Sequence, residues 1–183
     1  MANKNILRQL NSAKKISILF GLLSHTIRIL ILKNLAKEIR KNKKLIIKAN
    51  SKDLKKIPQN NSMRDRLLLN NARIEGMAKE IESLIKMPDP IGKIFDCRNR
   101  FGLKICRKRV PIGVVGVVYE SRPNVTTDVV AICIKSGNAI ILKGGKEARE
   151  SYVALGKIIK KALILSKANR EVVQFIDPKI KNA

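Results

Sequence analysis

Two adjacent glycines between lysines are the residues of this sequence whose types and spacing best suit ligand binding. Gly144 and Gly145 follow an apolar run and precede a helical pattern, with Lys143 and Lys146 on either side. Glycines let a backbone approach a ligand closely, and the first N–H groups of a helix have no partner inside it. The pattern predicts a nucleotide phosphate site. An ordinary strand-to-helix turn with surface lysines is the alternative.

Two common nucleotide-binding motifs are excluded at this position. The segment is not a P-loop, because Ile140 stands where the first glycine is needed and Glu147 replaces the hydroxyl that holds magnesium. The sequence also contains no G-x-G-x-x-G run. A nucleotide bound here is therefore held by a different arrangement of backbone and lysine.

The three cysteines have no metal-site spacing. Cys97, Cys106 and Cys133 form no C-x-x-C pair, and the only histidine is His25, so we expect no metal site. An odd number of cysteines without a signal peptide predicts reduced thiols and a cytoplasmic protein. Cys133 lies in an apolar segment and is expected to be a buried structural thiol. His25 has no evident partner and is expected at the surface.

The predicted secondary structure changes near residue 90, from helices alone to strands that alternate with helices. Residues 4–87 show helical spacing, with a cap at Asn70-Asn71 for a helix over 72–86, and Pro88 stops it. Beyond residue 90, β-branched runs and glycine turns alternate with helical patterns, which predicts an α/β fold with a parallel sheet. The elements predicted there are a hairpin over 91–109, a buried strand over 110–119, a helix over 123–135, a strand over 139–143, a helix over 146–165 and a strand over 172–176.

The net charge of +25 is the strongest compositional signal, and it suggests nucleic-acid binding through phosphate contacts. However, the 26 Lys are accompanied by 26 Ile and 15 Asn, which is the pattern of drift in an A/T-rich genome. An aromatic content of 3% also leaves few side chains for base stacking. Composition thus disfavours a nucleic-acid partner. His25 and Arg28 interrupt the apolar stretch of residues 16–32, which argues against a membrane span.

Longer runs of the sequence decide whether the glycine pair marks a nucleotide site or an ordinary turn. Residues 110–126 read V-P-I-G-V-V-G-V-V-Y-E-S-R-P-N-V-T, and residues 133–148 read C-I-K-S-G-N-A-I-I-L-K-G-G-K-E-A. With the shorter runs R-D-R-L at 64–67, D-P-I-G at 89–92 and R-K-R-V-P at 107–111, the sequence resembles gamma-glutamyl phosphate reductase, a branch of the aldehyde dehydrogenase superfamily. The resemblance covers nearly the whole chain.

This resemblance implies an aldehyde-dehydrogenase-like α/β fold. Residues 1–90 would form an N-terminal helical region, 91–110 an oligomerisation-type hairpin, and 111–183 part of a dinucleotide-binding domain with an incomplete parallel sheet. The implied reaction is NADPH-dependent reduction of L-glutamate 5-phosphate (gamma-glutamyl phosphate) to L-glutamate 5-semialdehyde in proline biosynthesis. In this family a cysteine thiolate attacks the acyl phosphate, phosphate leaves and hydride reduces the thioester. That cysteine is expected beyond residue 183, in a catalytic domain absent from this chain.

The resemblance also implies roles for individual residues. Many relatives carry arginine where Lys143 stands, and lysine keeps the charge but loses the planar fork. Asn124 would correspond to the superfamily's oxyanion-stabilising asparagine, and a helix N-terminal residue is the alternative. The implied cofactor-binding residues are Lys143, Gly144, Gly145 and Glu147 at the adenosine ribose or its 2′-phosphate, and Arg122, Pro123 and Asn124 at the nicotinamide end.

Without the nucleophile we expect the isolated chain to be inactive. The incomplete sheet and the hairpin should expose unpaired edges and apolar surface. One hypothesis is a split enzyme, completed by a separate polypeptide that carries the catalytic half. Another is the inactive product of a decaying gene, and a third is a basic binding protein that reuses the fold.

Overall fold

Helices fill the N-terminal half of the chain in the computed structural model, which describes residues 4–120 and 122–180. The side chains of Ser24 and Asn70 cap two of these helices by accepting hydrogen bonds from backbone N–H groups. The helical prediction for residues 4–87 and the cap at Asn70 are therefore confirmed. The helices are α1 (Lys4–Gly21), α2 (His25–Lys41), α3 (Lys43–Leu54), α4 (Met63–Leu67) and α5 (Asn71–Lys86).

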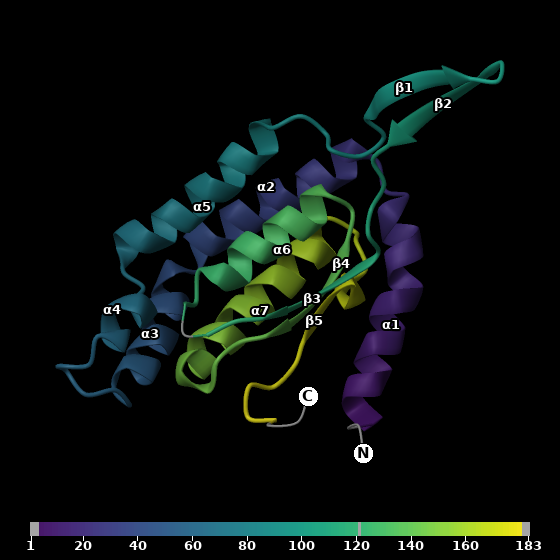
Figure 1. Cartoon of the computed structure of the whole chain (residues 1–183). Coiled ribbons are helices and arrows are strands. Elements are labelled where there is room, and N and C mark those ends of the chain that lie inside the picture. The colour runs from purple at the N-terminus through teal and green to yellow at the C-terminus, as the bar shows by residue number, and fades with distance from the viewer. Residues whose placement is uncertain (1–3, 121, 181–183) are drawn as a thin grey trace.

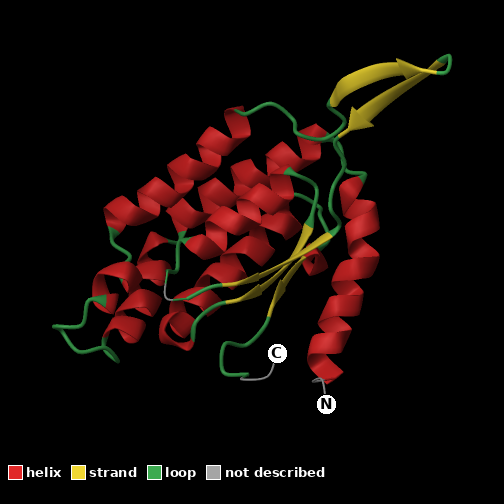
Figure 2. Ribbon diagram, in the orientation of Figure 1, coloured by secondary structure: helices red, strands yellow, loops and turns green. Residues whose placement is uncertain are grey.

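Strands and helices alternate in the second half, as the sequence predicts (Figure 2). One difference concerns the glycine pair: a 3₁₀ turn follows Gly145, so the next α-helix begins at Arg149, three residues later than predicted. The elements are β1 (Ile94–Arg100), β2 (Leu103–Lys108), β3 (Val114–Val118), α6 (Val125–Lys135), β4 (Ala139–Lys143), η1 (Lys146–Ala148), α7 (Arg149–Leu165), η2 (Arg170–Val172) and β5 (Val173–Phe175).

The parallel sheet has the strand order β3-β4-β5, and helices cover both of its faces (Figure 1). On one face Ile141 of β4 packs with Ile6 and Ala13 of α1. On the other, Ile140 and Leu142 belong to the main core, which includes residues of α6 and α7. This alternation follows from the pleat of a strand, which sends successive side chains to opposite faces. The α/β prediction is confirmed.

Helix α2 lies at the centre of the helical layer, against α5, α6 and α7. Its inner side chains Ile31, Leu32, Leu35 and Ile39 are fully buried. The core cluster that contains them also contains β4 and β5 residues, so the N-terminal helices and the sheet share one core. Within residues 4–120 and 122–180, no helix combines the length and the apolar character needed to cross a bilayer.

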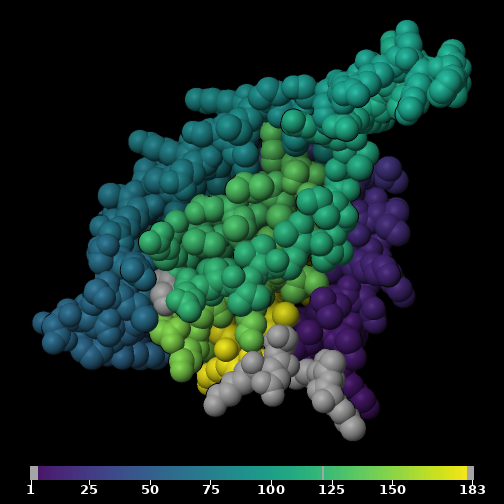
Figure 3. Space-filling model, in the orientation of Figure 1, coloured from purple at the N-terminus to yellow at the C-terminus, as the bar shows by residue number. Residues whose placement is uncertain are grey.

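Strand β3 corrects one prediction. The sequence run at residues 110–119 is β-branched and was expected to form a buried strand, but Val118 is 80% exposed and Ile112 is 83% exposed. In the described part of the chain β3 pairs with β4 only, so its other edge has no neighbouring strand. Figure 3 shows the segment that contains β3 lying uncovered on the front of the molecule. An apolar edge of this kind is a surface for further pairing.

The hairpin β1–β2 projects from the body of the molecule (Figure 3). Its antiparallel pairing places Arg98 opposite Ile105, which brings the neighbouring Cys97 and Cys106 to a Cα–Cα distance of 4.1 Å, joined as a disulfide. The expectation of three reduced thiols is therefore wrong for this pair. The sequence placed both cysteines in a hairpin, but the register that makes them face each other is set by the turn, which pairs Arg100 with Leu103 and Arg98 with Ile105.

Candidate functional site

The predicted site residues lie at one edge of the parallel sheet, where β3 and β4 end. Val118 pairs with Lys143, and the N–H of Tyr119 donates to the Lys143 carbonyl at 3.1 Å. The loop that carries Arg122 and the turn that carries Gly144 therefore leave the sheet side by side. Ligands of open α/β sheets bind outside the carboxyl ends of the strands, so this edge is the expected location of a cofactor.

Gly144 is buried beneath this edge, against two tyrosines. A Cβ at Gly144 would lie 3.0 Å from Cδ2 of Tyr152 and 3.3 Å from Oη of Tyr119. Tyr152 is held in place because its hydroxyl donates to the Leu142 carbonyl at 2.6 Å and lies 3.1 Å from the Ile176 carbonyl. Packing within the protein thus already requires glycine at position 144.

Replacing Gly144 with alanine is therefore expected to destabilise the fold by about 1–3 kcal/mol, because Tyr152 must move out of a well-packed position. Urea unfolding followed by circular dichroism measures this loss. Gly116→Ala is the matched control, because a Cβ at Gly116 meets nothing within 4 Å. Equal stability of Gly144→Ala and the unmodified chain would show that the tyrosine packing leaves room for a methyl group.

Backbone N–H groups in the turn after Gly144 differ in their availability. The N–H groups of Glu150 and Ser151 donate to the carboxylate of Asp53, at 3.0 and 2.8 Å, so the start of α7 is already capped. Within the described residues, no hydrogen bond engages the N–H groups of Lys146 and Glu147. The donors open to a ligand thus lie in η1, one turn earlier than the α-helix itself.

Lys143 carries the charge of this turn. Its side chain is half-buried and, within the part of the chain that the structure describes, has no carboxylate at ion-pair distance. Gly145 and Glu147 follow it in the turn and are both half-buried, and Lys146 is exposed. The turn therefore presents an unpaired ammonium group beside free N–H donors, which is a combination that suits a phosphate.

Arg122, Pro123 and Asn124 lead from β3 into α6. Arg122 is exposed and Pro123 is buried, while Asn124 is half-buried. Asn124 occupies the N-cap position, yet its side chain makes no capping bond and instead donates from Nδ2 to Asp128 Oδ2 at 3.1 Å. Asn124 is therefore a helix N-terminal residue, as the alternative expected, although its side chain does not cap the helix. One N–H of the amide remains to be donated elsewhere.

Arg122 and Asn124 line a recess of about 360 Å³ between α4, α5 and the start of α6. Lys143 and the glycine pair do not line it. The structure thus divides the predicted site into two parts, a turn at the end of β4 and a recess beside the end of β3. The lining residues are Asp65, Arg66, Leu68, Leu69, Arg73, Gly76, Met77, Glu80, Arg122 and Asn124.

Cys133 has no role as a nucleophile. It is a free thiol buried in α6, and its burial raises its pKa to about 11, so the thiolate is scarce near neutral pH. This agrees with the prediction of a structural thiol. Across residues 4–120 and 122–180, no three His, Cys, Asp or Glu side chains come together as metal ligands.

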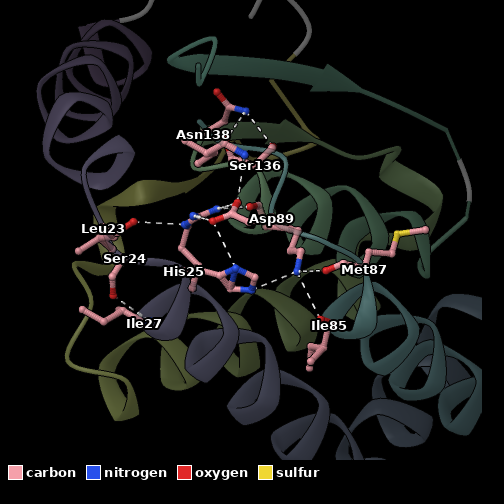
Figure 4. A network of polar contacts seen from close by, with 12 residues as sticks. Leu23, Ser24, His25, Ile27, Ile85, Met87, Asp89, Ser136 and Asn138 are labelled. Atoms are coloured by element: carbon pink, nitrogen blue, oxygen red, sulfur yellow. Dashed lines mark hydrogen bonds and ion pairs between the residues drawn. The ribbon is translucent and has the colours of Figure 1, made fainter. Parts of the chain in front are cut away.

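His25 corrects another prediction, because it belongs to a polar network instead of standing alone (Figure 4). Its Nδ1 lies 3.2 Å from Asp89 Oδ2, and its Nε2 lies 3.4 Å from the ammonium group of Lys135. The buried Arg28 bonds both carboxylate oxygens of Asp89, at 3.1 and 2.7 Å, and donates to the Lys135 carbonyl. Lys135 in turn donates to the Met87 carbonyl at 2.8 Å. The network joins α2, the segment after α5 and the end of α6.

Three side chains that make important contacts in the structure had no role predicted from the sequence. Asp53 caps α7 from 97 residues away, Asp89 neutralises Arg28, and Arg66 faces the recess beside Arg122. A weak signal existed for the last two, because R-D-R-L and D-P-I-G are among the runs that resemble the family. No local pattern marks Asp53, since its partners lie in a distant helix.

Comparisons with known proteins identify relatives of this chain. A gamma-glutamyl phosphate reductase of Enterococcus faecalis is 43% identical over 176 residues, which cover 93% of this chain and 42% of that enzyme. The crystal structure of gamma-glutamyl phosphate reductase from Thermotoga maritima superposes with a TM-score of 0.89 at 34% identity, over 96% of this chain and 43% of that one.

The wider superfamily shares the fold. A probable aldehyde dehydrogenase from Listeria monocytogenes gives a TM-score of 0.76 at 16% identity, over 98% of this chain and 38% of that one. No protein-family model matches the chain. The chain spans about 42% of the length of the Enterococcus relative. Sequence and structure together show that this chain is homologous to the N-terminal part of gamma-glutamyl phosphate reductase, with the fold of the aldehyde dehydrogenase superfamily.

Proposed function

We propose that this chain provides the NADPH-binding part of a reductase that converts gamma-glutamyl phosphate to L-glutamate 5-semialdehyde in proline biosynthesis. The observation that carries the proposal is the 43% identity to a gamma-glutamyl phosphate reductase over 93% of the chain. The geometry supports it, because an unpaired lysine and free N–H groups lie at the carboxyl end of a parallel strand. The reaction belongs to the amino-acid biosynthetic oxidoreductases.

The turn after β4 would hold the adenosine end of NADPH. In this proposal the Lys143 ammonium group pairs with the ribose 2′-phosphate, and the N–H groups of Lys146 and Glu147 donate to phosphate oxygens. Gly144 and Gly145 keep the turn close to the sheet, and Glu147 shapes the wall of the pocket. When bound, NADPH supplies the hydride of the reduction.

The loop after β3 would serve the reacting end. Asn124 keeps one amide N–H free while Asp128 fixes the orientation of its side chain. That N–H would stabilise the negative charge that develops on the acyl oxygen. Arg122 and Pro123 would border the nicotinamide. The catalytic cysteine would come from the portion of the relatives that this chain does not span.

The same proposal gives a role to each of the three regions of the chain. Residues 111–183 would form the dinucleotide-binding part, residues 1–90 its helical support, and residues 91–110 a hairpin that pairs in the oligomer. The portion with the cysteine would pack on exposed apolar residues, of which Phe101 (93% exposed) and Ile112 (83% exposed) are the most accessible in the hairpin and before β3.

Replacing Lys143 with alanine is expected to weaken NADPH binding about tenfold, because a charge-assisted bond to the 2′-phosphate is lost. NADH lacks that phosphate, so its affinity should change much less. Isothermal titration of the purified chain with both nucleotides measures the two effects.

Lys104→Ala on the exposed strand β2 is the matched control, because it removes one positive charge far from the turn. It should leave both affinities unchanged. Equal NADPH affinity of Lys143→Ala and the unmodified chain would remove Lys143 from the site, and no NADPH binding by the unmodified chain would contradict the cofactor proposal.

A further inference from the structure

The hairpin β1–β2 carries a disulfide in an exposed part of the molecule. Cys97 is exposed and Cys106 is half-buried, and their sulfur atoms are joined across the two strands. The hairpin extends away from the helices and the parallel sheet (Figure 1), which leaves the cross-link accessible. Cys133 is the opposite case, because it is a free thiol buried in α6. A thiol from solution can therefore reach the disulfide much more easily than it can reach Cys133.

The surroundings of this disulfide are strongly basic. Residues 93–109 contain seven lysines and arginines and one acidic residue, Asp96. The Asp96 carboxylate pairs with Arg98 and Arg107, at 3.1 and 3.3 Å. Among the described residues, no carboxylate lies at ion-pair distance from the other five cations, so the hairpin keeps a positive charge that the protein does not neutralise. These five are Lys93, Arg100, Lys104, Lys108 and Arg109.

Two of the unpaired cations share a face of the hairpin with the disulfide. Lys104 and Lys108 lie two residues before and two residues after Cys106 on β2. Successive side chains of a strand point to opposite faces, so all three point to the same side. Nearby cations stabilise a thiolate, and a stabilised thiolate is the better leaving group in thiol–disulfide exchange. The arrangement therefore favours opening of the disulfide with Cys106 as the leaving group and the more exposed Cys97 as the point of attack.

We propose that Cys97 and Cys106 form a reversible thiol–disulfide exchange site for a small anionic thiol. The thiolate of the ligand attacks Sγ of Cys97, a mixed disulfide forms, and the Cys106 thiolate leaves. A second ligand thiolate attacks the ligand sulfur of the mixed disulfide and releases the Cys97 thiolate. Two electrons pass to the protein, and its two thiolates take up the protons that the two ligand thiols released. The disulfide-linked dimer of the ligand, which is the product, reverses the sequence and oxidises the pair.

The charge of the hairpin sets the preferred charge of the thiol. A positive surface raises the local concentration of an anionic ligand and lowers that of a cationic one, and salt weakens both effects. Opening the cross-link also acts on the hairpin itself, because a two-stranded hairpin on its own is only marginally stable in water. Exchange at this site therefore loosens β1 and β2. The inference does not rest on the proposed function, because residues 93–109 take no part in the proposed NADPH site.

The test is reduction of the purified, folded chain by glutathione, an anionic thiol, and by cysteamine, a cationic one. Glutathione should open the disulfide about tenfold faster than cysteamine when the rates are compared per thiolate, and added salt should narrow the difference. Samples quenched with acid and analysed by peptide mass spectrometry give the rates and the position of the mixed disulfide. It should lie on Cys97, and Cys133 should stay unmodified.

A pair of lysine substitutions shows whether the hairpin charge is the cause. Lys104→Gln combined with Lys108→Gln should lower the ratio of the glutathione rate to the cysteamine rate about threefold. Lys44→Gln combined with Lys48→Gln is the matched control, because both lysines are exposed on α3, and it should leave the ratio unchanged. Equal rates for the two thiols, or an unchanged ratio in the hairpin variant, overturns the proposal. So does a mixed disulfide on Cys106, or a disulfide that resists glutathione while the chain stays folded.

Hydrogen exchange measures the effect on the hairpin. The backbone amides of β1 and β2 should exchange at least about tenfold faster in the reduced chain than in the oxidised one, because the cross-link no longer restricts the open hairpin. The amides of α2 should not change. The double variant Cys97→Ser, Cys106→Ser should behave as the reduced chain does. Equal exchange of β1 and β2 in the oxidised and reduced chains would contradict the loosening of the hairpin.

Discussion

Replacing Asp89 with alanine is expected to lower the free energy of unfolding by about 3–5 kcal/mol, because it leaves the charge of Arg28 buried without a carboxylate. The Arg28 side chain is 3% exposed and bonds both oxygens of Asp89. No other carboxylate of the described residues lies within ion-pair distance of Arg28. Urea unfolding of the two chains measures the loss directly.

Two variants show whether burial is the cause. Asp65→Ala breaks an exposed pair, with the Asp65 side chain 78% exposed, and should cost less than about 1 kcal/mol. The double variant Arg28→Met, Asp89→Leu removes both charges and should recover most of the loss. A loss in Asp89→Ala no larger than that in Asp65→Ala would contradict the role of the buried arginine.

The same carboxylate gives the stability a pH dependence. Burial alone would raise the pKa of Asp89, but the hydrogen bonds from Arg28 and from the Ile91 N–H outweigh it, so the pKa is lowered. The stabilising contribution of Asp89 is therefore complete above the pKa of an unfolded aspartate and is lost as the pH falls through the lower pKa of the folded state. Unfolding curves between about pH 2 and pH 6 should show this decline, and Asp89→Ala should lack it.

Replacing Asp53 with alanine is expected to destabilise the chain by about 2–4 kcal/mol, because the buried donors at the start of α7 lose their acceptor. The Asp53 side chain is fully buried and accepts from the N–H groups of Glu150 and Ser151 and from the Ser151 hydroxyl at 2.8 Å. This cap fixes the end of the turn that follows Gly144. NADPH affinity should therefore fall together with the stability.

Asp53→Asn is the matched variant, since it keeps the size of the side chain and one carbonyl acceptor. It should lose less than half of what alanine loses, measured by urea unfolding and by NADPH titration on the same samples. Equal losses in the two variants would show that the carboxylate charge, and not the number of acceptors, holds the start of α7.

Most of the secondary structure was predictable from the sequence because its signals are local. The apolar spacing in residues 72–86, the cap at Asn70 and the stop at Pro88 together define α5. The hairpin around residues 99–102 and β4 over residues 139–143 follow equally from turn residues and β-branched runs. The helix before β4 ends at Lys135, and Gly137 adopts a φ of +72° two residues later.

The predictions that were wrong concern burial and partners. Val118 belongs to an apolar run, yet it is 80% exposed, because burial depends on which elements cover a strand and not on the run itself. The pairing of Cys97 with Cys106 depends on the register of two strands. His25 was expected to be alone because Asp89 and Lys135 are distant in the sequence. Each of these outcomes requires contacts that no local pattern contains.

By itself, the sequence determined the order of helices and strands, the α/β class and the placement of Lys143 and Gly144 where β4 ends. These follow from periodicity, from turn residues and from long runs of matching residues. Only the tertiary structure decided that Asp53 caps α7, that Arg28 needs Asp89, and that Arg66 shares a recess with Arg122 and Glu80. The physical reason is that a charge is stabilised by the groups nearest to it in space, and here those groups come from elements far apart in the chain.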